Sequence, residues 1–270
     1  MKNIAILFVL ALAIISCSEK QNPQKESEEV TMLKEKIAKF VPVEITYDEA
    51  LLTDREKVVL EKLYRASKII DELFLEQVYI ENYQIKSDLI SKTANKSILE
   101  REPELKPQLE LFNIMFGPFD RLEDNKPFIG KNTKPLGANF YPVDMSKEEF
   151  EKWIKDNPAD EKAFTSEFTI IRRDNDKLVA IPYSEYFKNK LTTASNLLKE
   201  AAEFSDNLSL KKYLLSRANA FLSNDYYQSD MDWMDLKDHN IEIVIGPYEV
   251  YEDAMFNYKA AFESFVTIKD

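Results

Sequence analysis

Residues 224–270 read NDYYQSDMDWMDLKDHNIEIVIGPYEVYEDAMFNYKAAFESFVTIKD, and this stretch decides the fold. Over residues 241–245, β-branched and polar residues alternate, which predicts a strand. Gly246-Pro247 predicts a break after that strand, because glycine permits the dihedrals of a sharp turn and proline cannot donate to a ladder. Residues 248–253 then mix phenols with carboxylates, which are costly to bury unpaired. Such a mixture is typical either of a solvated loop or of the lining of a site.

The order of features in this stretch resembles the dipeptidyl-peptidase III family of zinc exopeptidases. In that family the pattern is close to Ile-Gly-Phe-Ile-Glu-x-Tyr-Arg-Asp, followed by Glu-Phe-Glu-Gly-Phe-Val. Residues 245–253 read IGPYEVYED here, and residues 261–266 read AFESFV. Among the departures from the family pattern, Glu252 stands in place of the arginine, and the spacing between the two halves differs by about one residue. Residues 137–142, GANFYP, also resemble bacterial branches of the family.

The resemblance implies a peptide-binding site at three residues. Glu249 matches the family's glutamate that anchors the ammonium group of the substrate through a charge-assisted hydrogen bond. Tyr251 matches the catalytic tyrosine that points towards the scissile carbonyl, where a phenol can stabilise the developing oxyanion. Glu263 belongs to the second segment and is expected to assist in binding the amine. The remainder of an oligopeptide substrate is expected to bind as an added strand at the sheet edge.

Length and composition exclude several classes of protein. The chain has 270 residues, of which 44% are hydrophobic and 31% charged, and this is typical of a globular protein. Its formal charge of -12 argues against nucleic acid as a partner, because a basic stripe that could neutralise phosphates is missing. Four glycines are too few for a phosphate-binding loop or a dinucleotide-binding turn.

Residues 1–17 have the pattern of a lipoprotein signal peptide. Lys2 precedes an apolar run too short to span a bilayer, and Ser16-Cys17 resembles the end of a bacterial lipobox. We expect Cys17, the only cysteine, to carry lipid and to anchor the protein in the bacterial cell envelope, on the periplasmic or outer-membrane face. A plain secretory signal with an incidental cysteine is the alternative. Residues 18–30 are polar and charged, and we expect them to form a flexible tether.

Residues 31–270 are predicted to form one mainly helical α+β unit. Helical periodicity and capping boxes predict helices from residue 31 to Pro42 and over residues 54–81, 83–94, 97–115, 146–157, 184–204 and 208–222. Pro103 and Pro107 are expected to interrupt the fourth, and residues 113–145 to be irregular. Strands are expected only within residues 167–182, as a hairpin, and within residues 241–270. The resemblance implies that this unit is the N-terminal, substrate-binding lower lobe, whose small antiparallel sheet belongs to a β-barrel that later sequence would complete.

Metal chemistry can be judged from the histidine count. A catalytic zinc needs three protein ligands, which in this family are two histidines of a His-Glu-x-x-Gly-His helix and a later glutamate. This chain has His239 alone, so we expect no metal site in it, although zinc is expected in a full-length family member. His239 is interpreted as an ordinary turn residue. Asp230, Asp232 and Asp235 suggest calcium, but the loop lacks the central glycine and terminal glutamate of an EF-hand.

Two classes of function stay open. The first is the substrate-binding portion of a zinc-dependent peptidase that removes dipeptides from peptide N-termini, inactive as this chain alone. The second is a lipoprotein that binds peptides or a partner without catalysis. The gene beyond codon 270 distinguishes them, because an in-frame His-Glu-x-x-Gly-His helix favours the enzyme and a stop codon favours the binding protein.

Overall fold

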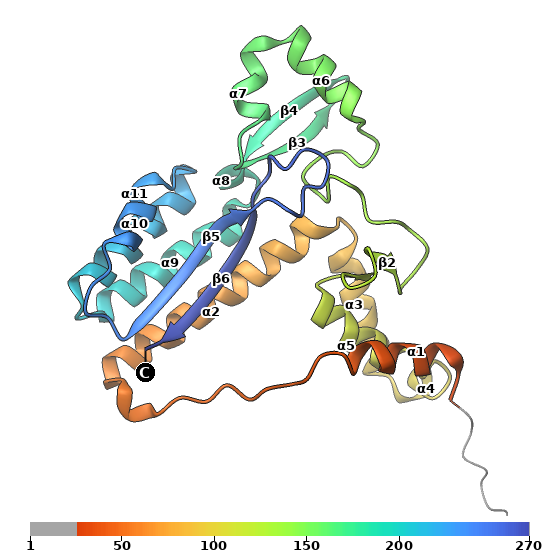
Figure 1. Ribbon diagram of the computed structural model, residues 1–270, viewed down its shortest axis with the longest axis horizontal. Helices are drawn as coiled ribbons and strands as arrows, with labels where there is room; N and C mark the ends of the chain where they lie inside the picture. Colours follow the sequence, from red (N-terminus) through yellow and green to blue (C-terminus); the bar gives the residue numbers. More distant parts are fainter. Residues whose placement is uncertain (1–25, 270) are drawn as a thin grey trace, which may run out of the picture.

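The computed structural model describes residues 26–269, and these residues are mainly helical (Figure 1). Their strands form three separate two-stranded antiparallel sheets, none of which closes into a barrel. The predicted α+β class with segregated strands is therefore confirmed. The signal peptide, Cys17 and the first part of the predicted tether lie outside the described residues. The last part of that tether is helical, because α1 (Glu28–Ile37) begins behind a Ser27 cap and buries Val30.

One long helix, α2 (Asp54–Val78), forms the axis of the larger body. Thr53 and Glu56 make a capping box at its start. Its buried residues recur at helical intervals and face α9 (Lys188–Phe204) on one side and the C-terminal hairpin on the other (Figure 1). Next to α9 lie α10 (Leu208–Ser223) and α11 (Tyr227–Met234). Sequence periodicity gives no sign of α11, whose only buried residues are Ser229 and Asp232.

The C-terminal hairpin consists of β5 (Ile241–Glu249) and β6 (Ala261–Ile268). The predicted break at Gly246-Pro247 is wrong, because both residues lie inside β5 and pair with β6. The register shifts only at a bulge between Pro247 and Glu249. Proline is tolerated in this strand because β5 pairs with one neighbour only among the described residues.

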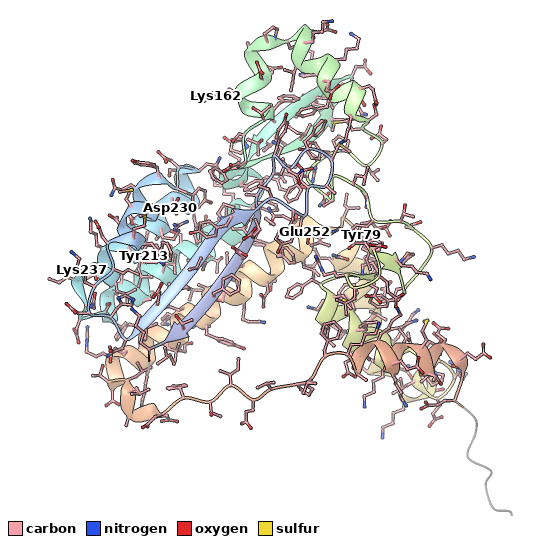
Figure 2. The ribbon with its side chains drawn as sticks, in the orientation of Figure 1. Tyr79, Lys162, Tyr213, Asp230, Lys237 and Glu252 are labelled. Atoms are coloured by element: carbon pink, nitrogen blue, oxygen red, sulfur yellow. The ribbon has the colours of Figure 1, made fainter. Side chains whose placement is uncertain are left out.

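Gly246 is required by the close approach of a buried arginine. A Cβ atom at Gly246 would lie 2.6 Å from Nη1 of Arg217, whose side chain is fully buried. Arg217 forms an ion pair with Asp230, and Figure 2 shows Asp230 and Tyr213 on this side of the hairpin. The guanidinium also lies 5.3–5.6 Å from the ring centroids of Tyr213, Tyr226 and Tyr248. Through these contacts, the Arg217 side chain holds β5 against α10 and α11.

Two smaller groups of elements flank this body (Figure 1). One contains α6 (Lys147–Asp156), η2 (Pro158–Asp160), α7 (Glu161–Phe164), β3 (Thr169–Asp174), β4 (Lys177–Pro182) and α8 (Tyr183–Tyr186). The other contains α1, α3 (Asn82–Thr93), α4 (Lys96–Leu99), α5 (Leu105–Met115), β1 (Phe119–Asp120) and β2 (Lys126–Pro127). Residues 41–48 run from this second group to η1 (Glu49–Leu51), just before α2.

The other observed elements follow the predicted ones closely, with two further corrections. Pro107 does not interrupt a helix, because it lies in the first turn of α5, where its missing N–H group would have no intrahelical partner. Residues 113–145 are mostly irregular as predicted, but they also contain the short β1–β2 pair. Within residues 26–269, no helix has both the length and the apolar character needed to cross a bilayer.

Buried polar groups hold the connection between β5 and β6. The carboxylate of Asp253 is fully buried, and the Tyr141 hydroxyl donates to it at 2.7 Å. It also accepts backbone N–H groups from Met255, Phe256, Tyr258 and Lys259. The buried Nζ of Lys259 donates at 2.6–2.8 Å to the carbonyl oxygens of Phe164 and Ser166 and to the hydroxyl of Thr169. Every charge in the connection therefore has partners, which offsets the cost of burial.

Glu252 attaches the same connection to the β1–β2 region. Its side chain is 1% exposed and forms ion pairs with Arg121 and, at 2.5 Å, with Lys134. Figure 2 shows Glu252 close to the C-terminal end of α2. Burial alone would raise the pKa of Glu252, but Arg121 and Lys134 hold it below its usual value. Glu252, which stands where the family pattern has an arginine, is thus paired with two cations.

Replacing Glu252 by glutamine should destabilise the fold in a pH-dependent way. The variant leaves Arg121 and Lys134 without their anion, so its free energy of unfolding at pH 7 should be about 3 kcal/mol lower. Because the folded-state pKa of Glu252 lies below its unfolded value, the stabilisation is present above the unfolded pKa and lost as pH falls through the folded pKa. In urea unfolding of both proteins between pH 7 and 3, the difference between their free energies of unfolding should therefore shrink as the pH falls. Glu151→Gln, at an exposed carboxylate of α6 without an ion pair among the described residues, is the control and should differ little from the wild type over the same range.

Candidate functional site

The three residues implied by the resemblance line one hollow. It lies between α2 and the β5–β6 hairpin and has a volume of about 230 Å³. Glu249 comes from the end of β5, Tyr251 from the connection, and Glu263 from β6. Its other lining residues are Ile70, Asp71, Phe74, Phe116, Ala261, Phe262, Ser264 and Phe265. The hairpin register explains the clustering, since Glu249 pairs with Ala261 and Glu263 lies two residues further along β6.

The hollow is acidic. Burial raises the pKa of Glu263, and the neighbouring charge of Glu249 raises it further. Burial also raises the pKa of the Tyr251 phenol, with the carboxylates of Glu252, Glu263 and Glu249 adding to this effect. The phenol therefore stays protonated at neutral pH and remains a hydrogen-bond donor. A site with two neighbouring carboxylates favours a bound cation, because the cation relieves their mutual repulsion.

Aromatic rings form the apolar wall of the hollow. Phe74 on α2 and Phe116 at the end of α5 meet edge to face, with centroids 5.3 Å apart. Arg121 lies over the Phe74 ring at 5.4 Å and also pairs with Glu252, so one guanidinium joins the wall to the buried connection. Phe265 is 59% exposed on β6 and Tyr251 is 61% exposed, which leaves apolar surface open beside the carboxylates. A ligand with a cationic end and apolar groups would match this surface.

Sequence reasoning missed part of this wall. Phe74 belongs to the helical stripe of α2, and nothing in that stripe distinguishes a residue that faces a hollow from one that faces the core. Phe116 lies in the stretch predicted to be irregular, and the structure places it at the end of α5, where it lines the hollow. The available signal was the sequence Phe116-Gly117-Pro118, which ends a helix and turns the chain.

A larger hollow elsewhere has less specific chemistry. It lies between α1 and the α4–α5 region, has a volume of about 940 Å³, and is lined by charges of both signs. None of the residues implied by the resemblance lies in it. We favour the smaller hollow as the site because its charges have one sign and converge with a phenol.

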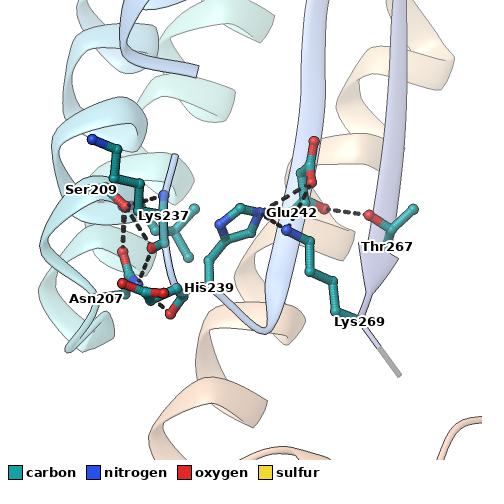
Figure 3. A network of polar contacts seen from close by, with 9 residues as sticks. Asn207, Ser209, Lys237, His239, Glu242, Thr267 and Lys269 are labelled. Atoms are coloured by element: carbon teal, nitrogen blue, oxygen red, sulfur yellow. Dashed lines mark hydrogen bonds and ion pairs between the residues drawn. The ribbon is translucent and has the colours of Figure 1, made fainter. Parts of the chain in front are cut away.

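His239 lies at the opposite end of the hairpin from Glu249. Its Nε2 atom is 3.1 Å from Glu242 and 2.6 Å from Nζ of Lys269 (Figure 3). These contacts tie the end of β6 to the loop before β5, which agrees with a structural role for His239 in the turn. Among residues 26–269, no group of three or more histidine, cysteine, aspartate or glutamate side chains could hold a metal ion.

Two of the three aspartates near His239 form ion pairs. Asp230 pairs with Arg217, and Asp232 pairs with Lys212 at 2.8 Å. The zinc implied by the resemblance therefore has no ligand set among the described residues, and we assign no zinc-dependent step to them.

Comparison with known proteins supports the resemblance. A structure of DPP III from Caldithrix abyssi is 62% identical in sequence, with a TM-score of 0.83, over 88% of this chain and 44% of that one. The structure of dipeptidyl-peptidase III from Corallococcus sp. strain EGB is 43% identical, with a TM-score of 0.82, over 89% of this chain and 44% of that one. No family model matches the chain.

A plant relative matches more distantly. Nudix hydrolase 3 of Arabidopsis thaliana is 34% identical over 288 aligned residues, which include 88% of this chain and 36% of the plant protein. The chain thus spans less than half the length of each of these three relatives. At 62% and 43% identity and with the same fold, the chain is similar to an N-terminal portion of these bacterial dipeptidyl-peptidase III proteins.

Proposed function

We propose that this chain is the substrate-binding portion of a zinc-dependent dipeptidyl-peptidase III-like metallopeptidase that removes dipeptides from peptide N-termini. The observation that carries the proposal is the convergence of Glu249, Glu263 and Tyr251 in one acidic hollow. The bacterial proteins that share this fold are described as dipeptidyl peptidases, which supports the same substrate class.

The carboxylates would recognise the N-terminus of an oligopeptide. Glu249 is exposed and can accept a charge-assisted hydrogen bond from the substrate ammonium. Glu263 is half-buried next to it, and its raised pKa would fall when a cation binds. An enzyme that releases dipeptides must measure two residues from the free amine, and fixed carboxylates provide that reference point.

Tyr251 would act at the scissile carbonyl. Its phenol keeps its proton at neutral pH because burial, and after it the neighbouring carboxylates, raise its pKa. A protonated phenol can donate a hydrogen bond to the oxyanion that develops when the carbonyl is attacked. Zinc would supply Lewis-acid chemistry in a full-length protein, but no ligands for it are found in the described residues. We therefore expect residues 18–270 alone to bind peptide without cleaving it.

The rest of the peptide would bind through its main chain. Each strand of the β5–β6 hairpin pairs with only one described neighbour, so each has a second edge without a described strand partner, although on β6 the Phe262 N–H group already donates to Oε1 of Gln77. An extended peptide can add to such an edge through hydrogen bonds that do not depend on its sequence.

The alternative is a peptide- or partner-binding lipoprotein without catalysis. It needs no zinc, and the lack of a group of metal ligands among the described residues is compatible with both proposals. Both proposals predict peptide binding at the same hollow, and the gene sequence beyond codon 270 separates them.

Glu249→Gln should selectively weaken the binding of peptides that have a free amine. Loss of one charge-assisted hydrogen bond costs about 1.5–3 kcal/mol, so the dissociation constant of a tetrapeptide should rise at least about tenfold. The N-acetylated form of the same peptide has no ammonium group and should bind both proteins equally. Titration calorimetry with residues 18–270 measures the dissociation constants of both peptides.

Tyr251→Phe is the matched comparison, because it removes one hydroxyl from the same hollow without changing its charge. It should leave the affinity near that of the wild type, and in a full-length protein it should lower kcat more than it changes KM. If the Glu249→Gln protein loses affinity equally for the free-amine and the N-acetylated peptide, the proposed role of this carboxylate is contradicted.

We also propose that Cys17 anchors the protein by lipid in the bacterial cell envelope. The support is the sequence pattern of residues 1–17, which lie outside the described residues. Cys17→Ala should leave unprocessed precursor or release the protein from membranes, as measured by fractionation and by mass spectrometry of the mature N-terminus. Ser16→Ala keeps a small residue before the cysteine and should be processed normally. Normal processing and membrane retention of the Cys17→Ala protein would refute the anchor.

A further inference from the structure

Arg217 and two tyrosines form a buried cluster whose polar atoms lack partners. Arg217 and Tyr213 are fully buried, and Tyr226 is 3% exposed. Within residues 26–269, the Nε and Nη1 atoms of Arg217 and the hydroxyl groups of both tyrosines form no hydrogen bond. These are four of the six buried side-chain atoms in this state among the described residues. Since nearly all buried polar atoms in proteins have a partner, such a concentration indicates a bound water molecule or ion.

The unpartnered atoms can all donate a hydrogen bond. The Nε and Nη1 atoms of a guanidinium carry hydrogen atoms and cannot accept. Burial raises the pKa of both phenols, to about 12 for Tyr213, so each keeps its proton at neutral pH. The guanidinium carbon lies 5.6 Å from the ring centroid of Tyr213 and 5.3 Å from that of Tyr226, so both phenols belong to the surroundings of one cation. The cluster therefore presents donors without a matching acceptor.

The buried side of the cluster is positively charged. The one ion-pair partner of Arg217 among the described residues is Asp230, whose side chain is 45% exposed and which accepts from Nη2 only. Water screens the exposed carboxylate but does not reach the guanidinium, so Asp230 compensates the buried cation incompletely. Figure 2 shows Asp230 and Tyr213 on the α10–α11 side of the hairpin. The exposed edge at Asp230 gives a small ion a path from solvent.

We propose that Arg217, Tyr213 and Tyr226 bind a monatomic anion of the halide class, such as chloride. A halide only accepts hydrogen bonds, whereas a water molecule would bring two further donors into a site that already has an excess of them. A bulky anion is excluded on the β5 side, because even a Cβ atom at Gly246 would lie 2.6 Å from Nη1. The bound ion would strengthen the attachment of β5 to α10 and α11. None of these residues lines the acidic hollow, so the halide site does not depend on the proposed peptide binding.

Anomalous diffraction from bromide locates such an ion directly. Crystals of residues 18–270 grown in sodium bromide should show a bromide peak within hydrogen-bond distance of Nε or Nη1 of Arg217 and of a phenol oxygen. A water molecule or empty density at this position would overturn the proposal. Bromide peaks confined to the protein surface would show an adventitious ion only, and would overturn it as well.

Chloride should also stabilise the protein in a saturable way. At constant ionic strength, replacing gluconate by chloride should raise the unfolding midpoint by about 3–5 °C once chloride exceeds its dissociation constant about tenfold. Constant ionic strength keeps the screening of surface charges unchanged, so a difference between the two salts reports binding. Equal midpoints in both salts would contradict the site.

Tyr213→Phe and Tyr183→Phe are a matched pair for this measurement. Both remove one hydroxyl from a fully buried ring, but the Tyr183 hydroxyl already donates to the Ala260 carbonyl oxygen at 2.8 Å. Tyr213→Phe should remove most of the chloride-dependent rise without lowering the midpoint in gluconate, because its hydroxyl has no acceptor in the described part of the chain. Tyr183→Phe should lower the midpoint in both salts and keep the rise.

A full chloride response in the Tyr213→Phe protein would mean that the ion binds elsewhere, and would refute the proposed site. If that variant does not fold, Tyr226→Phe is measured in its place, with the same expected loss of the response. The bromide experiment uses the unaltered sequence and decides the question independently of either variant.

Discussion

The buried carboxylates of Glu252 and Asp253 are the constraint on which the candidate site depends. An uncompensated charge in this position would cost several kcal/mol, so each carboxylate must be matched. Asp253 is matched by backbone N–H groups and the Tyr141 hydroxyl, and Glu252 by Arg121 and Lys134. Since Tyr251 directly precedes this pair, fixing the carboxylates also fixes the backbone that presents the phenol. The connection is therefore held from two sides of the molecule.

The polar anchors and the site share components. Arg121 contacts both Glu252 and the ring of Phe74, which lines the acidic hollow. On the other side of β5, Arg217 occupies the space that a side chain at Gly246 would need. The strand that ends at Glu249 is thus positioned by Arg217 at Gly246, just before its bulge, and by Arg121 at Glu252, just beyond its end. This leaves Glu249 and Glu263 close together without a cation among the described residues, as expected for a site that binds a cationic ligand.

The sequence predicts those parts of the fold that depend on local patterns. The capping box at Thr53 and the alternation over residues 241–245 correspond to α2 and β5 in the structure. The prediction at Gly246-Pro247 is wrong because local rules assign a turn to this pair. In the structure the pair continues the strand, and the bulge and the nearby Arg217 depend on residues distant in the sequence. The partners of Glu252 lie more than a hundred residues earlier in the chain, so no local pattern could reveal them.

The candidate site was accessible from the sequence only through resemblance. Glu249, Tyr251 and Glu263 come from a recognisable motif, and the hairpin register places them in one hollow. Phe74 and Phe116 join them through helix packing, which sequence spacing does not encode.

The central claim is that the acidic hollow binds the ammonium group of a peptide, and carboxyl-detected NMR of Glu263 tests it most directly. The pKa of Glu263 is raised in the free protein by burial and by Glu249. A saturating peptide with a free N-terminus should lower that pKa, because a cation next to the carboxylate favours its charged form. The N-acetylated peptide should have no such effect. Binding of the free-amine peptide with an unchanged Glu263 titration would contradict the account.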